Sequence, residues 1–201
     1  MTENTLIVFV KNLIDGNVKT RIAKKKGNQF ALQLYTELLN ILKNSLSGLR
    51  GWEVVIYYSD FIEETDNWPF VISQERQNGI NLGDRMYKAF KQELKKAEKV
   101  VMIGSDIPDL KKIHIQNAST SLQANDIVIG PTIDGGYYLI GMKKLDKVIF
   151  SGIKWGESDV YFETCKRLTQ MNYSYDSLSK LRDIDEVDDI PDYVLRKLNK
   201  Q

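Results

Sequence analysis

The stretch Leu6-Ile7-Val8-Phe9-Val10 is five consecutive apolar residues, and it decides the fold class. A run without polar interruption is typical of a strand that is buried on both faces, as in a parallel sheet. Four later runs repeat the pattern: Val54–Tyr58, Val100–Ile103, Ile127–Ile129 and Tyr137–Ile140. The last two runs stand so close together in the sequence that we expect a hairpin or a sharp return between them.

Helical periodicity occupies the sequence between and after these runs. Apolar residues recur at helix spacing in four segments: Phe30–Leu42, Leu82–Ala97, Val160–Leu168 and Ile190–Leu198. Strand followed by helix, several times over, predicts an α/β fold with a mainly parallel sheet. No internal repeat or linker divides the chain, so we expect residues 1–201 to form a single domain.

Composition narrows the class of protein. Of 201 residues, 42% are hydrophobic and 27% charged, which is ordinary for a globular domain. The 28 basic and 27 acidic residues nearly cancel, so neither a nucleic acid nor an anionic membrane is an expected partner. One cysteine and one histidine exclude an internal disulfide and a Cys/His zinc cluster. No targeting or membrane-spanning segment is visible, and we therefore expect a cytoplasmic protein.

The loop after the first strand is strongly basic and leads into a helix. Ligands of open α/β sheets bind beyond the carboxyl ends of the strands, which is where this loop lies. Cations beside free N–H groups at a helix start suit phosphate, and a glycine lets the backbone approach a ligand. The predicted phosphate ligands are Lys11, Gly16, Lys19 and Arg21. The adjacent run Lys24–Lys26 is predicted to be a solvated basic turn.

Asp106 follows the strand Val100–Ile103 almost directly and should project into the crevice. A carboxylate that faces a phosphate loop suits Mg²⁺ or Mn²⁺, because these ions take one or two carboxylates and share phosphate oxygens with a substrate. Asp109 is predicted to cap the following helix instead.

A second acidic segment lies late in the chain. Alternation places Asp183 and Asp185 on one side of an extended stretch, so that one of them would complete the metal site. Acidic residues at a helix start are also stabilised by the helix dipole without binding any ligand.

Two further loops are candidates for substrate contact. Asp134-Gly135-Gly136, between two strands, is an ordinary hairpin turn sequence. Beside the basic loop and Asp106, its glycines would let a sugar or a base lie against the backbone, and Asp134 would hold a hydroxyl. Trp155 lies in a glycine-flanked loop, and it would either stack on a substrate ring or belong to the core.

Six motifs in order resemble a bacterial glycosyltransferase-A-like family, formerly a domain of unknown function. Some of its members are arsenosugar-biosynthesis glycosyltransferases. The motifs lie at Gly16–Arg21, Leu82–Met86, Ile103–Leu110, Gly130–Gly141, Gly152–Gly156 and Asp183–Asp185. The resemblance places the chain in the nucleotide-diphospho-sugar transferase superfamily. It implies a Rossmann-like three-layer α/β/α fold with one antiparallel strand in a mostly parallel sheet.

The resemblance also implies roles for individual residues. The Lys-Thr-Arg loop is similar to the triphosphate loop of molybdenum-cofactor and phospholactate guanylyltransferases, so Lys19 and Arg21 would hold nucleotide phosphates. Asp106 would match the metal aspartate of the superfamily. Asp185 would match a second metal aspartate, found in sugar-activating cytidylyltransferases. The Gly135-Gly136 turn would face the sugar or the acceptor.

Together these observations predict a metal-dependent transferase that uses a nucleotide-bound substrate and a small-molecule acceptor. The predicted catalytic residues are Lys19, Arg21 and Asp106, which would neutralise charge on phosphate. Glycosyl transfer from a nucleotide sugar is ranked first. The alternatives are guanylyltransferase-like nucleotidyl transfer from an NTP to a phosphorylated acceptor, and a non-catalytic nucleotide-binding protein.

Charge is segregated along the chain despite the near-neutral total. Lys11–Lys26 holds six cations and one acid, whereas Asp183–Asp192 holds six acids and no cation. We expect the fold to bring these two segments to the same rim of the sheet.

Overall fold

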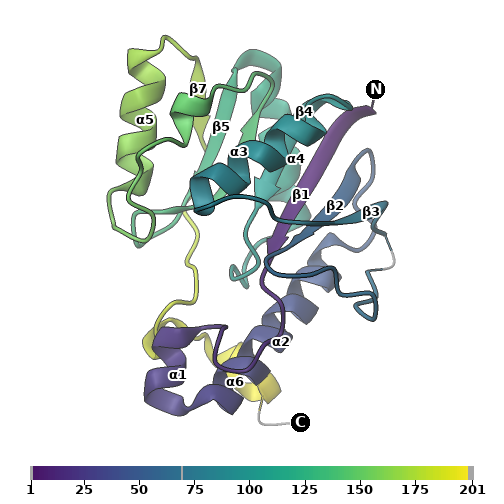
Figure 1. The fold of residues 1–201 in the computed structure, drawn as a ribbon, viewed down its shortest axis with the longest axis vertical. Coiled ribbons are helices and arrows are strands. Elements are labelled where there is room, and N and C mark those ends of the chain that lie inside the picture. The colour runs from purple at the N-terminus through teal and green to yellow at the C-terminus, as the bar shows by residue number, and fades with distance from the viewer. Residues whose placement is uncertain (1, 69, 199–201) are drawn as a thin grey trace.

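The computed structural model describes residues 2–68 and 70–198, which form one seven-stranded sheet with helices on both faces (Figure 1). The strand order is β3-β2-β1-β4-β6-β5-β7. The strands are β1 (Thr2–Val10), β2 (Glu53–Tyr58), β3 (Ser73–Arg76), β4 (Ala97–Ile103), β5 (Ile127–Pro131), β6 (Tyr137–Met142) and β7 (Tyr175–Ser177). The helices are α1 (Thr20–Lys26), α2 (Asn28–Leu46), α3 (Leu82–Glu93), α4 (Lys112–Ala124), α5 (Val160–Gln170) and α6 (Asp192–Leu198), with short 3₁₀ turns η1 (Lys147–Ile149) and η2 (Val187–Asp189).

Strand directions confirm the predicted fold class. Among the described strands, β6 is antiparallel to both of its neighbours and the other pairings are parallel. The predicted return between β5 and β6 is an antiparallel pair in which Ile129 lies opposite Ile140. The connection between these strands is too short for a parallel crossover, which explains the single reversed strand.

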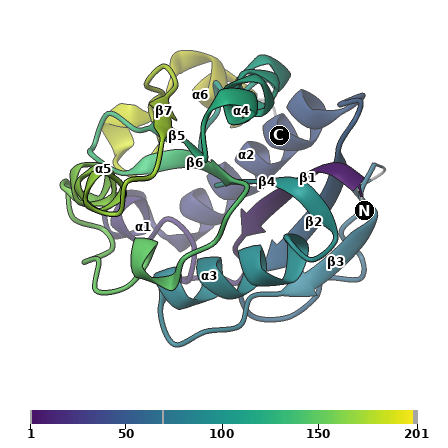
Figure 2. The same ribbon diagram turned by 90° about the horizontal axis from the view of Figure 1, so that it is seen from above.

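Alternate residues of the strands pack into two separate cores, one on each face of the sheet. Both faces of a strand are therefore apolar, which explains the uninterrupted apolar runs. In β1, Leu6 and Val8 pack into the core beneath α2 and α4, whereas Ile7 packs into the core beneath α3 and α5. Seen from above, α3 and α5 lie on one side of the sheet and α2 and α4 on the other (Figure 2). All three β1 residues are fully buried.

Two local predictions need correction, and two strands were not predicted. The helix that starts at Leu82 ends at Glu93, and Ala97 already belongs to β4, because the chain must turn back into the sheet. Asp109 does not cap α4: the N-cap is Lys111, and the Asp109 carboxylate accepts a hydrogen bond from Tyr193 Oη at 3.0 Å. The short strands β3 and β7 were not predicted, since their residues are polar and half exposed.

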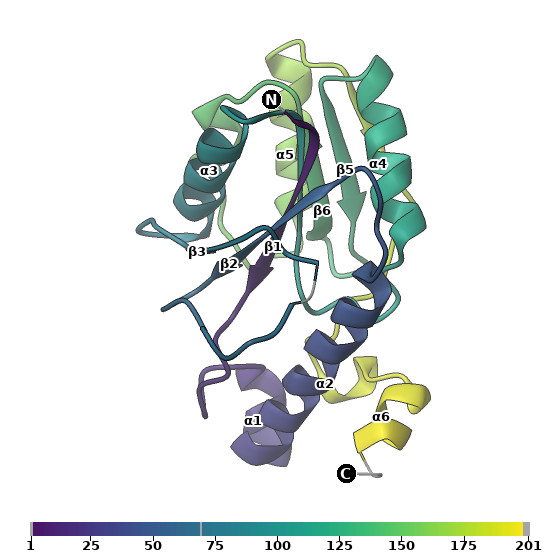
Figure 3. The same cartoon turned by 90° about the vertical axis from the view of Figure 1, so that its right-hand side faces the viewer.

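A small helical group lies beyond the carboxyl edge of the sheet. It consists of α1, the first turns of α2, and α6 (Figures 1 and 3). Residues 11–19 and 178–191 connect this group to the sheet. The helices therefore lie just beyond the carboxyl edge, where ligands are expected to bind. α1 forms within the basic stretch that was predicted to be a loop. No helix of the described residues is both long and apolar enough to cross a membrane.

Candidate active site

Lys19 and Asp106 meet at the centre of this edge, although they are far apart in the sequence. Lys19 Nζ lies 3.0 Å from Asp106 Oδ2 and also donates to the backbone carbonyl of Ile184. The Lys19 side chain is only 8% exposed, whereas that of Asp106 is 40% exposed. The carboxylate therefore reaches open space while the ammonium group is held behind it.

Lys19, whose side chain reaches Asp106, has an unusual backbone conformation. Its φ of 45° and ψ of 48° lie in the left-handed region, directly before α1. Residues other than glycine occupy this region at a cost of about 1 kcal/mol or more, and such residues cluster at functional sites. Gly16, with φ of 77°, shares the left-handed region, and its missing side chain leaves room for Asn28.

Asp183 is held close to Asp106 by backbone hydrogen bonds on either side of it. Leu181 N donates to Pro131 O, and Ile184 N donates to Asp106 O, both at 3.1 Å. Burial, followed by the negative charges of Asp134 and Asp106, raises the pKa of the Asp183 carboxyl to about 6. Among the described residues, Lys19 pairs with Asp106, and no ion pair is formed to Asp134 or Asp183.

The sequence names Asp183 only as an alternative to Asp185. The Asp-Ile-Asp alternation indicated that Asp183 and Asp185 share a side, and both do line the same cavity, with Ile184 buried between them. The resemblance favoured Asp185. The structure pairs the Asp185 carboxylate with Arg21 and leaves Asp183 facing the other acids.

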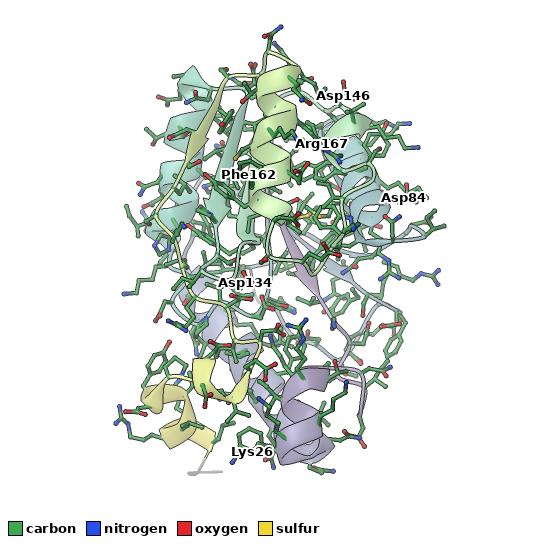
Figure 4. The ribbon with its side chains drawn as sticks, turned by 90° about the vertical axis from the view of Figure 1, so that its left-hand side faces the viewer. Lys26, Asp84, Asp134, Asp146, Phe162 and Arg167 are labelled. Carbon is green, nitrogen blue, oxygen red and sulfur yellow. The ribbon has the colours of Figure 1, made fainter. Side chains whose placement is uncertain are left out.

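The basic and acidic segments meet directly, as the segregated charges led us to expect. Arg21 binds Asp185, and Lys25 Nζ lies 2.8 Å from Glu186 Oε2. The carboxylate of Glu186 in turn raises the pKa of Lys25. Lys26 lies at the far end of α1 from Asp134 (Figure 4), which agrees with its predicted solvated role.

Two cavities open at this edge and share a wall. The shared lining residues are Phe9, Leu82, Gly104, Asp106 and Asp185. The smaller cavity, of about 250 Å³, is lined by two of the predicted phosphate ligands, Lys11 and Lys19. The larger cavity, of about 320 Å³, is lined by the predicted acceptor residues Asp134, Gly136 and Trp155.

The turn at Gly135 packs closely against another segment of the chain, the start of α5 and the residues before it. A side chain on Gly135 would lie 1.8 Å from the backbone oxygen of Ser158, and φ is 97°. Gly135 O accepts from Tyr161 N at 2.8 Å, which seats the turn on the start of α5. Asp134 accepts hydrogen bonds from Gly136 N at 3.0 Å and from the Thr132 hydroxyl. Figure 4 shows Asp134 between the sheet and the lower helices.

Tyr35 joins the ends of two strands behind the smaller cavity. Its buried hydroxyl lies 2.7 Å from Ser105 Oγ and accepts from Lys11 N at 2.8 Å. Burial raises the pKa of Tyr35 far above its usual value, so this phenol stays neutral. The bridge fixes the end of β1 relative to the turn that carries Asp106.

The predicted residue Trp155 and the polar residues Asn81 and His114 have structural contacts within the chain. Trp155 is half-buried and packs edge-on against Tyr137 with ring centroids 6.1 Å apart. Asn81 caps α3 by accepting from Asp84 N at 2.9 Å. His114 accepts from Lys111 N at 3.0 Å and thereby closes the start of α4.

The oxygen-rich pair Asp106 and Asp183 fits a hard divalent cation. Within residues 2–68 and 70–198, no group of three or more His, Cys, Asp or Glu side chains is gathered closely enough to hold a metal ion. Mg²⁺ does not need such a cage, because it is commonly held by one or two carboxylates together with substrate phosphates and water. Burial is the main cause of the raised pKa of Asp183 and the neighbouring negative charges add to it, so a bound cation would lower this pKa.

Comparison with known proteins agrees with this fold. A family model described as an uncharacterized protein conserved in bacteria, DUF2064, matches residues 42–157. The chain belongs to DUF2064. This confirms the resemblance to a family once described only as a domain of unknown function.

Relatives of this DUF2064 protein are transferases, which bears out the predicted enzyme class. The 2-phospho-L-lactate guanylyltransferase of Methanocaldococcus jannaschii is 27% identical over 181 residues, which are 87% of this chain and 75% of the relative.

Solved structures agree as well. One from Desulfovibrio desulfuricans G20, provisionally assigned as a nucleotide-diphospho-sugar transferase, has a TM-score of 0.86 and 34% identity, and the match covers 100% of this chain and 89% of that one. The fold is also that of 4-diphosphocytidyl-2C-methyl-D-erythritol synthase from Anaerococcus prevotii, with a TM-score of 0.59, 14% identity, and coverage of 98% and 96%.

Proposed function

We propose that this protein is a metal-dependent nucleotidyltransferase that joins part of a nucleoside triphosphate to a small acceptor. The observation that carries the proposal is the position of Lys19 and Asp106. The pair lies where the smaller cavity, which is lined by Lys11 and Lys19, meets the larger cavity, which is lined by several carboxylates. The guanylyltransferase relatives support the same choice.

In this proposal the nucleotide occupies the smaller cavity. Lys19 and Thr20 lie at the start of α1, and Lys11 follows β1, so the cavity offers ammonium groups and a hydroxyl to phosphate oxygens. Arg21, on the first turn of the same helix, would meet the outer phosphates once it leaves Asp185. Cations at a developing phosphate charge act through positioning and electrostatics.

The reaction consists of one displacement at phosphorus. An acceptor oxygen in the larger cavity forms a bond to the α-phosphorus while the bond between that phosphorus and the β-phosphate oxygen breaks. Pyrophosphate leaves with the bonding electron pair, and Lys19 stabilises the negative charge that develops. Asp106 and Asp183 would hold a Mg²⁺ or Mn²⁺ ion, which supplies further charge neutralisation when bound.

The larger cavity strengthens the case for metal dependence. Its described lining includes five carboxylates (Asp106, Asp134, Glu157, Asp183 and Asp185) and no lysine or arginine. An acceptor that carries its own phosphate would be repelled from this wall in the absence of a cation. Divalent metal is therefore expected to be required for acceptor binding as well as for turnover.

The proposal is tested by incubating the protein with each NTP, Mg²⁺ or Mn²⁺, and a panel of phosphorylated acceptors. Release of pyrophosphate that depends on both metal and acceptor is the expected result. Binding of NTP without pyrophosphate release across the panel would instead support the non-catalytic alternative.

Glycosyl transfer is the second candidate, and the side chains that line the larger cavity favour it. Trp155 and Tyr137 offer aromatic surface, and the carboxylates around them accept hydrogen bonds from hydroxyls, which together suit a sugar ring. The provisional assignment of the Desulfovibrio structure also agrees with it. Incubation with nucleotide sugars separates the two chemistries, because glycosyl transfer releases a nucleoside diphosphate and no pyrophosphate.

A further inference from the structure

The larger cavity has an apolar end that the proposed reaction does not use. Met102 of β4 and Ile140 of β6 lie opposite each other in the antiparallel pair, so their side chains share one face of the sheet. Phe9 is on that face too, because it lies two residues beyond Ile7, the partner of Met102 in β1. These cavity-lining side chains form an apolar row across three adjacent strands.

Side chains from outside this row complete the apolar end. Met86, from α3, lines the cavity and packs into the same core as Met102. Trp155 and Tyr137 line it as well, and the hydroxyl oxygen of Tyr137 is fully enclosed, so its ring is the part that is left to face the cavity. The cavity therefore extends from the edge of the sheet into the layer between the sheet and α3.

The carboxylates lie at the other end of the cavity. Asp106 follows β4, Asp134 lies in the connection between β5 and β6, and Asp183 follows β7, so all three are beyond the strand ends. Met102 and Ile140, by contrast, lie within strands. A cavity divided in this way fits a ligand with the same division, because burial of apolar surface is favourable and a polar group at the apolar end would lose its hydrogen bonds.

We propose that the acceptor is amphipathic: a phosphomonoester whose phosphate lies at the carboxylate end and whose apolar body, of about six carbons, lies between Met86, Met102 and Ile140. This inference rests on the proposed function, because the carboxylates can receive a phosphate only together with the divalent cation. The cavity of about 320 Å³ sets the size, since an apolar cavity of about 150 Å³ holds benzene and the remainder is left for the phosphate. Methionine side chains are unbranched and polarisable, and they adapt to the shape of such a body.

The test measures binding of methyl, butyl, hexyl and octyl phosphate to the full chain by calorimetry in the presence of Mg²⁺. Each added methylene is expected to tighten binding about threefold as far as hexyl phosphate, because each removes further apolar surface from water. Octyl phosphate should bind no more tightly than hexyl phosphate, because the cavity is then full. Omission of Mg²⁺ should weaken binding of the whole series and leave its dependence on chain length in place.

Met86→Gln places an amide of similar length at the apolar end. The gain in affinity from methyl to hexyl phosphate should shrink about tenfold in this variant, because the alkyl chain would deprive the amide of water. Met142→Gln is the matched control, since Met142 is buried in the same core but does not line the cavity. It should keep the dependence on chain length of the wild type. If either variant does not fold, the series on wild-type protein decides.

The inference is overturned if wild-type protein binds methyl and hexyl phosphate with equal affinity or binds neither. An undiminished dependence on chain length in folded Met86→Gln would overturn it as well. Pyrophosphate release from an NTP that is as fast with methyl as with hexyl phosphate would keep the proposed function and refute only the amphipathic acceptor. Binding that depends on chain length, without pyrophosphate release from any NTP, would keep an amphipathic ligand and refute nucleotidyl transfer.

Discussion

The backbone and the side chain of Asp106 have different partners. Its backbone carbonyl accepts from Ile184 N, which ties the acidic segment to the end of β4. Its side chain pairs with Lys19 and remains 40% exposed. The backbone is therefore structural, and the carboxylate is available to a metal ion.

Replacement of this carboxylate should remove function without loss of the fold. In Asp106→Asn, Lys19 keeps the Ile184 carbonyl as a partner, so the melting temperature should change little. We expect turnover to fall by about 10²–10³-fold and metal-dependent nucleotide binding to be lost. Calorimetric titration of NTP with and without Mg²⁺ measures this. Asp109→Asn, on the same loop but bound to Tyr193, is the control. Retention of metal-dependent affinity in Asp106→Asn would show that the metal lies elsewhere.

Asp183 gives the site a dependence on pH. Its pKa is raised from the ordinary 3.8 to about 6, so between these values the folded protein binds a proton that the unfolded chain has lost. This group therefore favours the folded state at low pH, and its contribution is lost as pH rises from about 4 through 6. A metal ion that binds the ionised form should bind more tightly over the same window.

Measurements on Asp183→Asn check both consequences. Mn²⁺ affinity of the wild type should rise between pH 5 and pH 7, and that of the variant should be weaker and flatter. The free energy of unfolding should fall less steeply from pH 4 to pH 6 in the variant. Identical pH profiles for the two proteins would contradict this placement of Asp183.

At the scale of elements, α1 and the acidic segment are joined by ion pairs at an exposed surface. Arg21 and Asp185 have side chains 55% and 41% exposed, and Lys25 and Glu186 are exposed to a similar degree. Such pairs contribute about 0–1 kcal/mol, because water and salt screen them. Breaking the Arg21–Asp185 pair should therefore cost little, so that Arg21 is able to leave Asp185 for a phosphate, as the proposed function requires.

Arg21→Ala tests this expectation. We expect its melting temperature to stay within about 2 °C of the wild type, because the exposed pair contributes so little. Affinity for nucleoside triphosphates should fall about tenfold through loss of a charge-assisted contact. Lys25→Ala, one turn along the same helix, is the control and should bind normally. A large loss of stability in Arg21→Ala would assign Arg21 a structural role.

The connection between β5 and β6 depends on Gly135. A β-carbon there would collide with Ser158 O, and the backbone would have to move away from α5. Gly135→Ala should therefore destabilise the protein by about 2–4 kcal/mol, combining backbone strain with overpacking. Gly51 has a positive φ of 78° with nothing near its β-carbon, and Gly51→Ala should cost only about 1 kcal/mol. Urea unfolding of both variants measures the difference, and equal losses would refute the packing argument.

For the whole molecule, ligand binding should be visible as stabilisation. The site gathers residues from β1, β4, the segment after β7 and α1, so a ligand bound there links the sheet to the lower helices. At a concentration 100 times Kd, binding adds about 2.7 kcal/mol, which should raise the melting temperature by roughly 5–10 °C. Scanning calorimetry with NTP and Mg²⁺ measures this. The shift should disappear with EDTA, and the nucleoside alone should cause little change. An equal shift with the nucleoside would mean that the phosphates are not bound.

The sequence by itself determined the fold class and most of the edge that carries the site. Uninterrupted apolar runs such as Leu6–Val10 can only be satisfied by strands covered on both faces, and residues that follow parallel strands share one edge. Local pattern therefore sufficed to indicate Lys19, Asp106 and Asp134. The pattern also indicated Gly135 as a residue that faces the substrate, whereas in the structure Gly135 packs against Ser158 of this chain.

Tertiary structure alone decided how these groups pair. The proposed preference for Asp183 over Asp185 rests on the ion pair of Asp185 with Arg21 and on backbone hydrogen bonds to Pro131 and Asp106, which are remote in the sequence. The buried amide of Gln77 likewise donates to backbone carbonyls of β1 and β2, which the sequence pattern does not indicate. Sequence periodicity reports which face of an element is buried, whereas charge pairing and free hydrogen-bonding atoms depend on distances across elements, which only the assembled sheet sets.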